Sequence, residues 1–205
     1  MGEPASDPDR RRLVVGLGNP GTKYAMTRHN VGWRVIDELV DRTAAGPGRD
    51  AFDSITWDVR FCRGRNSARV LLAKPLTFMN RSGRAVRAAC DFYKVPPEDV
   101  LIVMDDLALE TAQLRARAGG SAGGQKGLVD VIRQLGTDQV PRLRIGIGAA
   151  PPAWDAADYV LSKFTDEETE LIGCAIKDAA DAVEDWLFDG LQRVMERYNR
   201  RTGDK

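Results

Sequence analysis

The chain has 205 residues, and its 30 basic and 30 acidic residues balance to a formal net charge of zero. This length fits one domain with an ordinary hydrophobic core, so no disulfide or structural metal is needed for folding. Three cysteines without CxxC spacing argue against a secreted disulfide framework and a zinc site, and indicate a reducing, cytoplasmic location. No apolar run approaches the roughly 20 residues that span a bilayer, so membrane insertion is not expected.

The zero net charge hides a segregation of charge along the chain. Residues 60–144 carry 15 Lys or Arg against 8 Asp or Glu, whereas residues 155–189 carry 11 acidic residues against 2 basic ones. A basic segment of this kind is able to steer a phosphate-bearing ligand even when the whole chain is neutral. Solvated arginines balanced by an acidic helix explain the same counts, so charge alone leaves both interpretations open.

Hydrophobic periodicity predicts strands and helices that alternate along the chain. We expect a polar leader over residues 1–12, one domain over residues 13–200 and a tail over residues 201–205. Strands are predicted at residues 13–17, 53–62, 70–72, 100–104, 114–118 and 143–147, and helices at residues 31–40, 81–94 and 128–135. A capping box formed by Thr165 and Glu168 opens a long amphipathic helical region that extends to residue 200.

This alternation predicts an α/β fold, with a single domain, a mixed twisted sheet, helices on both faces and a C-terminal helical region. Ligands of such sheets bind beyond the carboxyl ends of the strands. The candidate site residues are therefore those that follow predicted strands: Asn19, residues 74–80, Asp105, Asp106 and the loop after Ile147.

Two glycine-rich motifs match known sites but lack the context that those sites require. The glycines at positions 16, 18 and 21 match the dinucleotide-binding fingerprint, but Pro20 continues a loop where the fingerprint needs a helix N-terminus. Residues 119–123 match the nucleophile elbow of serine hydrolases, but no histidine follows Ser121 to act as its base. A nucleotide-dependent dehydrogenase is therefore a remote alternative.

The single histidine, His29, is the candidate general base, because imidazole titrates near neutral pH. Asn19 and Asp105 each follow a predicted strand, so both are able to project toward one crevice with His29 at its mouth. A carboxylate that holds one ring nitrogen leaves the other to take a proton from water. A structural histidine and a turn-forming aspartate explain the same residues. One histidine and three scattered cysteines favour a reaction without metal or cofactor.

Five short motifs occur in order along the chain: residues 17–24 (LGNPGTKY), 27–32 (TRHNVG), 74–83 (KPLTFMNRSG), 105–107 (DDL) and 142–148 (RLRIGIG). Their order and spacing resemble those of bacterial peptidyl-tRNA hydrolases over nearly the whole chain. The resemblance implies that a monomeric protein hydrolyses the ester between a peptide and the terminal ribose of tRNA. Such a reaction recycles tRNA from peptides that stalled ribosomes have dropped.

The same resemblance implies a role for each candidate residue. His29 activates water, Asp105 orients His29, and Asn19 positions the water or stabilises the oxyanion. Four further residues are expected to contact the substrate: Tyr24, Met79, Asn80 and Lys126. The arginines expected near the tRNA phosphates are Arg115, Arg117, Arg142 and Arg144.

The chain departs from the family at Gln125 and Lys126, where members commonly have His-Asn. The Asn normally contributes to the site, so Lys126 either weakens the geometry around the water or replaces it by a charge contact with tRNA. An RNA-binding relative that has lost turnover is therefore the alternative function. The presence of His29 and Asp105 disfavours it, because a pure binder needs neither a base nor a residue that orients it.

Overall fold

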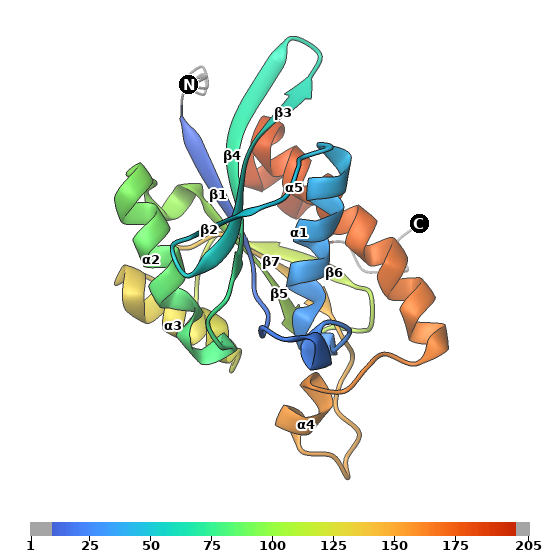
Figure 1. The fold of residues 1–205 in the computed structure, drawn as a ribbon. Coiled ribbons are helices and arrows are strands. Elements are labelled where there is room, and N and C mark those ends of the chain that lie inside the picture. Colours follow the sequence, from blue (N-terminus) through green and yellow to red (C-terminus); the bar gives the residue numbers. More distant parts are fainter. Residues whose placement is uncertain (1–9, 200–205) are drawn as a thin grey trace.

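The computed structural model describes residues 10–199, and within them one mixed sheet of seven strands forms the centre of the molecule (Figure 1). The strand order is β2-β3-β4-β1-β5-β7-β6. The four central strands β4, β1, β5 and β7 are parallel, whereas β3 and β6 run antiparallel beside them. The strands are β1 (Arg11–Gly16), β2 (Arg49–Ala51), β3 (Ser54–Arg63), β4 (Asn66–Pro75), β5 (Val100–Asp106), β6 (Leu114–Arg117) and β7 (Arg142–Gly146).

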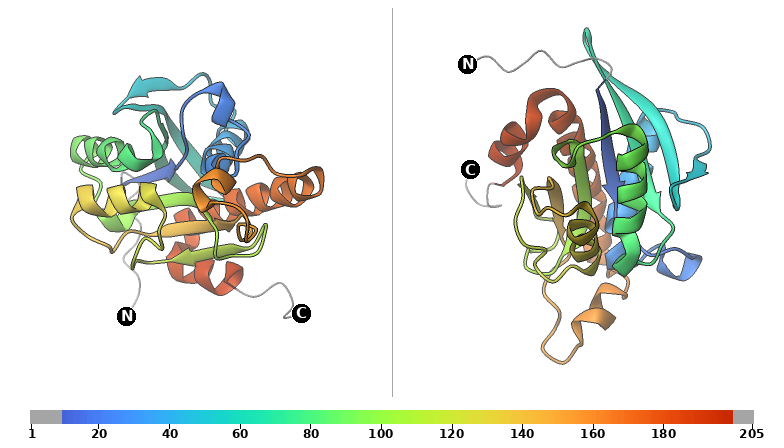
Figure 2. Two further views of the ribbon diagram at one scale, coloured as in Figure 1. Left: turned by 90° about the horizontal axis from the view of Figure 1, so that it is seen from below. Right: turned by 90° about the vertical axis from the view of Figure 1, so that its left-hand side faces the viewer.

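Helices cover both faces of this sheet, with α2 and α3 on one side and α1 and α5 on the other (Figures 1 and 2). Side chains alternate along β1, so Val14 packs with α1 and α5 while Leu13 and Val15 pack with α2 and α3. The helices are α1 (Val31–Arg42), α2 (Ser82–Tyr93), α3 (Lys126–Leu135), α4 (Ala156–Val160) and α5 (Asp166–Tyr198), and the 3-10 turns are η1 (Thr22–Tyr24), η2 (Arg28–Asn30), η3 (Met79–Arg81) and η4 (Pro97–Asp99). The predicted α/β class and the helices on both faces are confirmed.

Most predicted elements match the observed ones to within a few residues at their ends. β1 begins at Arg11, two residues before the predicted strand at residues 13–17. Residues 1–9 and the expected tail at 201–205 lie outside the described residues. β2 and α4 were not predicted, because they span only three and five residues and are too short for a periodic pattern.

Two glycines allow helices to approach the positions that carry the site. A Cβ atom on Gly32 would lie 2.4 Å from the carbonyl oxygen of Val103, so only glycine brings α1 this close to β5. A Cβ atom on Gly83 would lie 2.2 Å from the carbonyl oxygen of Asp130, and α2 therefore packs closely on α3. Because η2 and η3 immediately precede α1 and α2, these contacts position both turns at the carboxyl ends of the central strands.

The long helix α5 bends at Gly190, whose φ of 80° and ψ of 168° are not helical. Arg12 of β1 donates hydrogen bonds to the carbonyl oxygens of Trp186 at 2.9 Å and Leu187 at 2.7 Å, just before the bend. These carbonyls lack helical partners where the first segment ends, so Arg12 caps that segment. Although α5 spans 33 residues, neither it nor any other described helix is long and apolar enough to cross a membrane.

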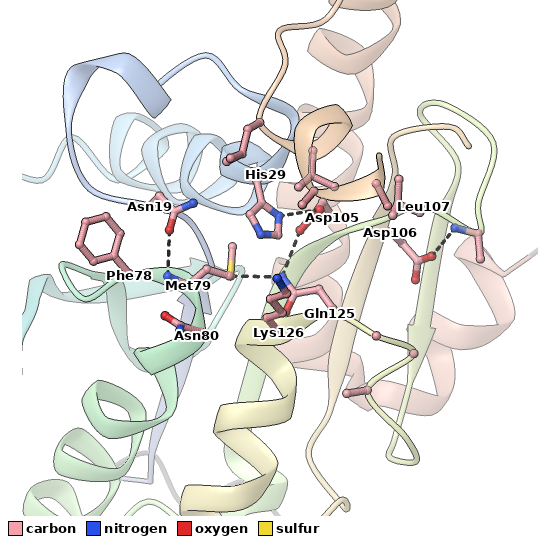
Figure 3. Close-up of a pocket in the computed structure, with 18 residues that line it drawn as sticks. Asn19, His29, Phe78, Met79, Asn80, Asp105, Asp106, Leu107, Gln125 and Lys126 are labelled. Atoms are coloured by element: carbon pink, nitrogen blue, oxygen red, sulfur yellow. Dashed lines mark hydrogen bonds and ion pairs between the residues drawn. The ribbon is translucent and has the colours of Figure 1, made fainter. Parts of the chain in front are cut away.

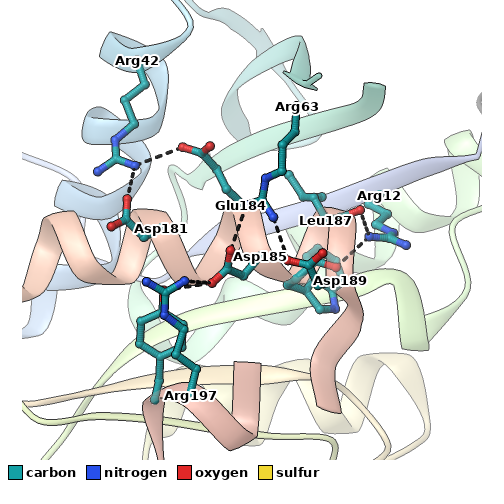
Figure 4. Close-up of polar contacts among 11 residues, drawn as sticks. Arg12, Arg42, Arg63, Asp181, Glu184, Asp185, Leu187, Asp189 and Arg197 are labelled. Atoms are coloured by element: carbon teal, nitrogen blue, oxygen red, sulfur yellow. Dashed lines mark hydrogen bonds and ion pairs between the residues drawn. The ribbon is translucent and has the colours of Figure 1, made fainter. Parts of the chain in front are cut away.

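The acidic charge of α5 is largely turned toward arginines of the same molecule (Figure 4). Asp185, 6% exposed, accepts hydrogen bonds from Arg63 of β3 and from Arg197 beyond the bend, each at 2.8 Å. Arg42 of α1 contacts Asp181 at 2.6 Å. The acidic segment therefore docks α5 on the sheet and on α1 and fixes the angle at its bend.

Candidate active site

A cleft with a volume of about 570 Å³ opens at the carboxyl ends of the central strands (Figure 3). Its lining comes from the segments after β1, β4 and β5, from η2, from the glycine loop that precedes α3, and from α4. The structure therefore places the cleft where the strand-end rule predicts it. Its lining side chains include Asn19, His29, Met79, Asn80, Asp105, Gln125 and Lys126.

His29 and Asp105 form the centre of this cleft. Nδ1 of His29 lies 2.8 Å from Oδ2 of Asp105, and the two residues are only 8% and 2% exposed. A carboxylate accepts a hydrogen bond, so the proton of the neutral ring sits on Nδ1 and the lone pair sits on Nε2. Nε2 faces the cleft (Figure 3). The predicted proximity of these two residues is confirmed.

Asn19 lies across the cleft from this pair, with its amide orientation fixed by its neighbours. Its Oδ1 accepts a hydrogen bond from the backbone N–H of Met79 at 2.8 Å. A backbone N–H only donates, so the atom that faces it must be oxygen, and Nδ2 is left on the cleft side as a donor (Figure 3). The fully buried Asn30 holds the backbone of Asn19 through both of its amide atoms, at 2.8 and 2.9 Å.

The sequence analysis noted Gln125 only as a departure from the family and assigned it no role. In the structure it is the N-cap of α3, where its Oε1 accepts a hydrogen bond from the N–H of Leu128 at 2.8 Å. Its Nε2 donates to Oδ1 of Asp105 at 3.1 Å and contacts the sulfur of Met79 at 3.2 Å. Its position just before a predicted helix was the available signal for the cap, but the contact with Asp105 was not predictable.

The other expected substrate residues fall into two groups. Met79, Asn80 and Lys126 line the cleft, with Met79 buried and the other two exposed. Tyr24 does not line it: this residue lies in η1, half-buried, with its ring 4.7 Å from the ammonium of Lys23. That Tyr24 contacts the substrate therefore stays a prediction.

The four expected phosphate-binding arginines lie on one face of the sheet edge, as two cross-strand pairs. Arg115 of β6 is opposite Arg144 of β7, and Arg117 is opposite Arg142. No acidic side chain among residues 10–199 forms an ion pair with Arg115 or Arg117, whereas Arg144 pairs with Asp106 beside the cleft. Arg115 and Arg144 are the pair nearer to the cleft, because β7 ends there.

Arg142 differs from the other three arginines because it is buried. It is 1% exposed, and its guanidinium donates to the carbonyl oxygens of Gly120 at 2.7 Å and Asp138 at 3.1 Å. Burial lowers the pKa of Arg142. The expectation that Arg142 contacts tRNA is corrected, because the glycine loop covers it and it has no surface for a phosphate.

The fold and the cleft define a class of enzyme. A buried carboxylate holds an imidazole whose second nitrogen is open to the cleft, and an amide donor faces them. None of the 18 residues that line the cleft is a serine, threonine or cysteine, so the lining offers a base for water but no such nucleophile. This arrangement is the kind of site in which a hydrolase activates water.

Comparison with known proteins identifies the family. The family model described as peptidyl-tRNA hydrolase matches residues 13–205. The peptidyl-tRNA hydrolase of Rhodopirellula baltica is 50% identical over 94% of this chain and 99% of its own, and that of Symbiobacterium thermophilum is 44% identical over 92% and 98%. A crystal structure of peptidyl-tRNA hydrolase from Acinetobacter baumannii superposes with a TM-score of 0.82, at 34% identity over 95% of this chain and 97% of that one.

The chain belongs to the peptidyl-tRNA hydrolase family. Enzymes of this family cleave peptidyl-tRNA and release tRNA and peptide, and this chain has that activity. The resemblance of its five motifs is confirmed. The alternative of an RNA-binding relative without turnover is not favoured. The glycines after β1 lead into the three-residue 3-10 turn η1 and not into the α-helix that a dinucleotide fingerprint requires.

Proposed function

We propose that the cleft hydrolyses the ester of peptidyl-tRNA by direct attack of a water molecule that His29 activates. The observation that carries this proposal is the 2.8 Å contact between Nδ1 of His29 and Oδ2 of Asp105 at the buried end of the cleft. Nε2 takes a proton from water as the water oxygen bonds to the ester carbonyl carbon. Asp105 holds the ring and stabilises the imidazolium that forms.

The negative charge that develops on the carbonyl oxygen then needs a donor. Asn19 supplies one, because its Nδ2 faces the cleft while its Oδ1 is held by Met79. The intermediate collapses by breaking the bond to the ribose oxygen, and this oxygen takes back the proton from His29. One base therefore serves both steps. The products are the ribose hydroxyl of free tRNA and a peptide carboxylic acid, which then loses its proton to solvent.

The wall of the cleft offers different chemistry to the two parts of the substrate. Phe78 and Leu161 line it while 57% and 40% exposed, and they provide apolar contacts for the peptide, whose backbone Asn80 is placed to bind. Lys126 is the first residue of α3 and is exposed. A cation is unfavourable at a helix N-terminus, so its presence there is best explained by an anionic ligand such as the tRNA backbone.

The acceptor end of the tRNA lies along the edge strands in this proposal. Like charges directly opposite each other destabilise a sheet, yet Arg115 faces Arg144 across β6 and β7. Phosphates at this edge remove that repulsion, and Arg117 extends the same surface away from the cleft. Contacts with backbone charge rather than with bases suit an enzyme that accepts many tRNAs.

We further propose that the enzyme acts as a monomer in the cytoplasm. One chain supplies the base, its carboxylate, the amide donor and the basic edge. The ribosome produces the substrate in the cytoplasm. Light scattering after size-exclusion chromatography should give the mass of one chain, and a stable dimer mass would contradict this proposal.

The decisive experiment compares wild type with His29→Ala on an N-blocked aminoacyl-tRNA, without added metal. Wild type should release tRNA, whereas the variant should lose several orders of magnitude in kcat because no other lining group replaces the base. Binding of uncleaved tRNA, measured separately, should persist. Equal turnover by the two proteins would contradict the mechanism.

A further inference from the structure

The side chain of Gln125 links the N-terminus of α3 to the catalytic pair. In α3, the N–H of Leu128 hydrogen-bonds to Oε1 of Gln125 at 2.8 Å. Nε2 of Gln125 reaches the catalytic pair through Oδ1 of Asp105 at 3.1 Å. Because the N–H of Leu128 only donates, the amide cannot turn over, and its NH₂ group must face the carboxylate.

The Nε2 donor of Gln125 fixes the orientation of the buried Asp105 carboxylate. Asp105 is 2% exposed, and a buried carboxylate oxygen without a hydrogen bond is costly. Gln125 binds Oδ1, and His29 binds Oδ2 at 2.8 Å. The two contacts together fix the rotation of the carboxylate, so Oδ2 keeps the direction that holds the imidazole.

The amide has a second property that matters for catalysis, because it neither gains nor loses a proton. The titratable side chains that line the cleft with Asp105 are His29 from η2, Lys126 from α3 and Asp106 from β5, and Asp106 is paired with Arg144 from β7. Gln125 adds a strong donor to this set without adding charge. The carboxylate is thus held in the same way across the working pH range.

We propose that Gln125 is a positioning residue for the catalytic pair: it anchors Asp105 to the N-terminus of α3 with a donor that does not titrate. This inference rests on the proposed role of His29 and Asp105. Gln125 itself touches no reacting atom, so its loss lowers the fraction of time that His29 spends in the productive orientation. The effect belongs to kcat rather than to substrate binding.

The sharpest test is Gln125→Glu, which keeps the shape of the side chain. One of its oxygens still accepts from the N–H of Leu128, and a negative charge at a helix N-terminus is favourable, so the fold is retained. The other oxygen faces Oδ1 of Asp105 at about the same separation, and two carboxylates so close share a proton in acid but repel each other once both are ionised. The shared proton keeps the pair in place only at low pH.

We therefore expect Gln125→Glu to lose roughly tenfold to 100-fold in kcat at pH 8 and much less at pH 5.5, relative to wild type at each pH. Val129→Glu is the matched control, because it adds the same charge to α3 at a side chain that is 51% exposed and outside the cleft lining. Its pH profile should be that of wild type.

Two further variants separate positioning from a merely structural role. Gln125→Met keeps the length but has no donor, and should lose roughly tenfold in kcat at every pH with KM unchanged. Gln125→His restores a ring N–H donor and should recover most of that loss. The melting temperature of each variant is measured alongside, so that a loss of fold is recognised.

The outcomes distinguish this inference from the proposed function. If wild type hydrolyses the substrate while folded Gln125→Met and Gln125→Glu keep its kcat and its pH profile, Gln125 does not position the pair and the inference is overturned. A loss in Gln125→Glu that does not vary with pH overturns the role of charge at Asp105. A wild type without hydrolysis contradicts the proposed function itself.

Discussion

At the scale of single residues, Asn19 shows how one side chain acquires a directional role. Its Oδ1 is occupied by the N–H of Met79, and its backbone is clamped by Asn30. The side chain therefore cannot rotate to exchange its two amide atoms. The donor that faces the cleft is set by the fold before any substrate binds, which is what electrostatic stabilisation of an oxyanion requires.

Replacement of the Nδ2 donor gives a prediction for catalysis. Asn19→Asp keeps an acceptor for the N–H of Met79, so the fold is kept, but a charged oxygen takes the place of the donor and repels the oxyanion. We expect kcat to fall by roughly 10² to 10³. Single-turnover hydrolysis of an N-blocked aminoacyl-tRNA measures the effect, and chemical denaturation checks stability. Wild-type kcat in this variant would exclude Asn19 as the oxyanion donor.

The residues of the cleft differ in how far the sequence predicts them. Asn19 follows β1 and Asp105 lies at the end of β5, and the strand-end rule brings them together with His29. Arg142 and Arg144 are equivalent in sequence pattern, but only the structure reveals that the glycine loop covers the first of them. The contact of Gln125 with Asp105 depends on how α3 docks, and no local pattern carries that information.

At the scale of secondary-structure elements, Arg28 connects the turn that carries His29 to α5. Its guanidinium donates to both carboxylate oxygens of Glu168, at 2.9 and 2.7 Å, and is 5% exposed. The rings of Tyr159 and Phe164 lie 4.3 and 4.7 Å from it. Glu168 is also the N3 residue of the capping box that was predicted from the sequence and is now confirmed.

The hydrogen bonds from Arg28 lower the pKa of Glu168 below its ordinary value. A carboxyl group with a lowered pKa in the folded state stabilises the protein above its unfolded pKa, and this contribution is lost as pH falls through the folded pKa. The pair should therefore support the fold at pH 7 and fail in acid.

Glu168→Ala tests this element. It leaves the Arg28 guanidinium buried without its partner, and should lower the free energy of unfolding by about 3 kcal/mol at pH 7. The difference from wild type should shrink when urea denaturation is repeated at pH 3 to 4. Thr165→Ala is the control, because it removes the helix cap but not the ion pair, and should cost about 1 kcal/mol. Equal losses in both variants would mean that the pair contributes nothing beyond the cap.

The bend in α5 could not be predicted from the sequence. Gly190 lies inside an amphipathic pattern that reads as one helix, and the bend depends on contacts from Arg12 and Asp185 that are remote in the chain. The capping box, in contrast, is local and was predicted. Local signals thus fixed where elements begin, while packing determined how α5 bends.

At the scale of the whole molecule, the acidic and the basic segments of the sequence have different roles. The acidic residues of α5 face arginines of β3 and α1, and so serve the fold. The basic residues at the edge formed by β6 and β7 include Arg115 and Arg117, which form no ion pair with a described acidic side chain. A neutral chain therefore keeps a basic surface beside its cleft.

The arginines at positions 117 and 142 are cross-strand neighbours with opposite exposure, and they give a matched test of this surface. Arg117→Met should weaken tRNA binding and reduce the slope of log affinity against log salt by about 0.7 to 0.9, since one phosphate contact is lost. Its kcat and stability should stay at wild-type values.

Arg142→Met should instead lower the free energy of unfolding by about 1–3 kcal/mol, because the carbonyl oxygens of the glycine loop lose their donor. The salt slope of this variant should be unchanged. Affinities at four or more salt concentrations, together with denaturation curves for both variants, measure these effects. An unchanged slope in Arg117→Met would remove Arg117 from the tRNA-binding surface. A reduced slope in Arg142→Met would show that Arg142 contacts tRNA despite its burial.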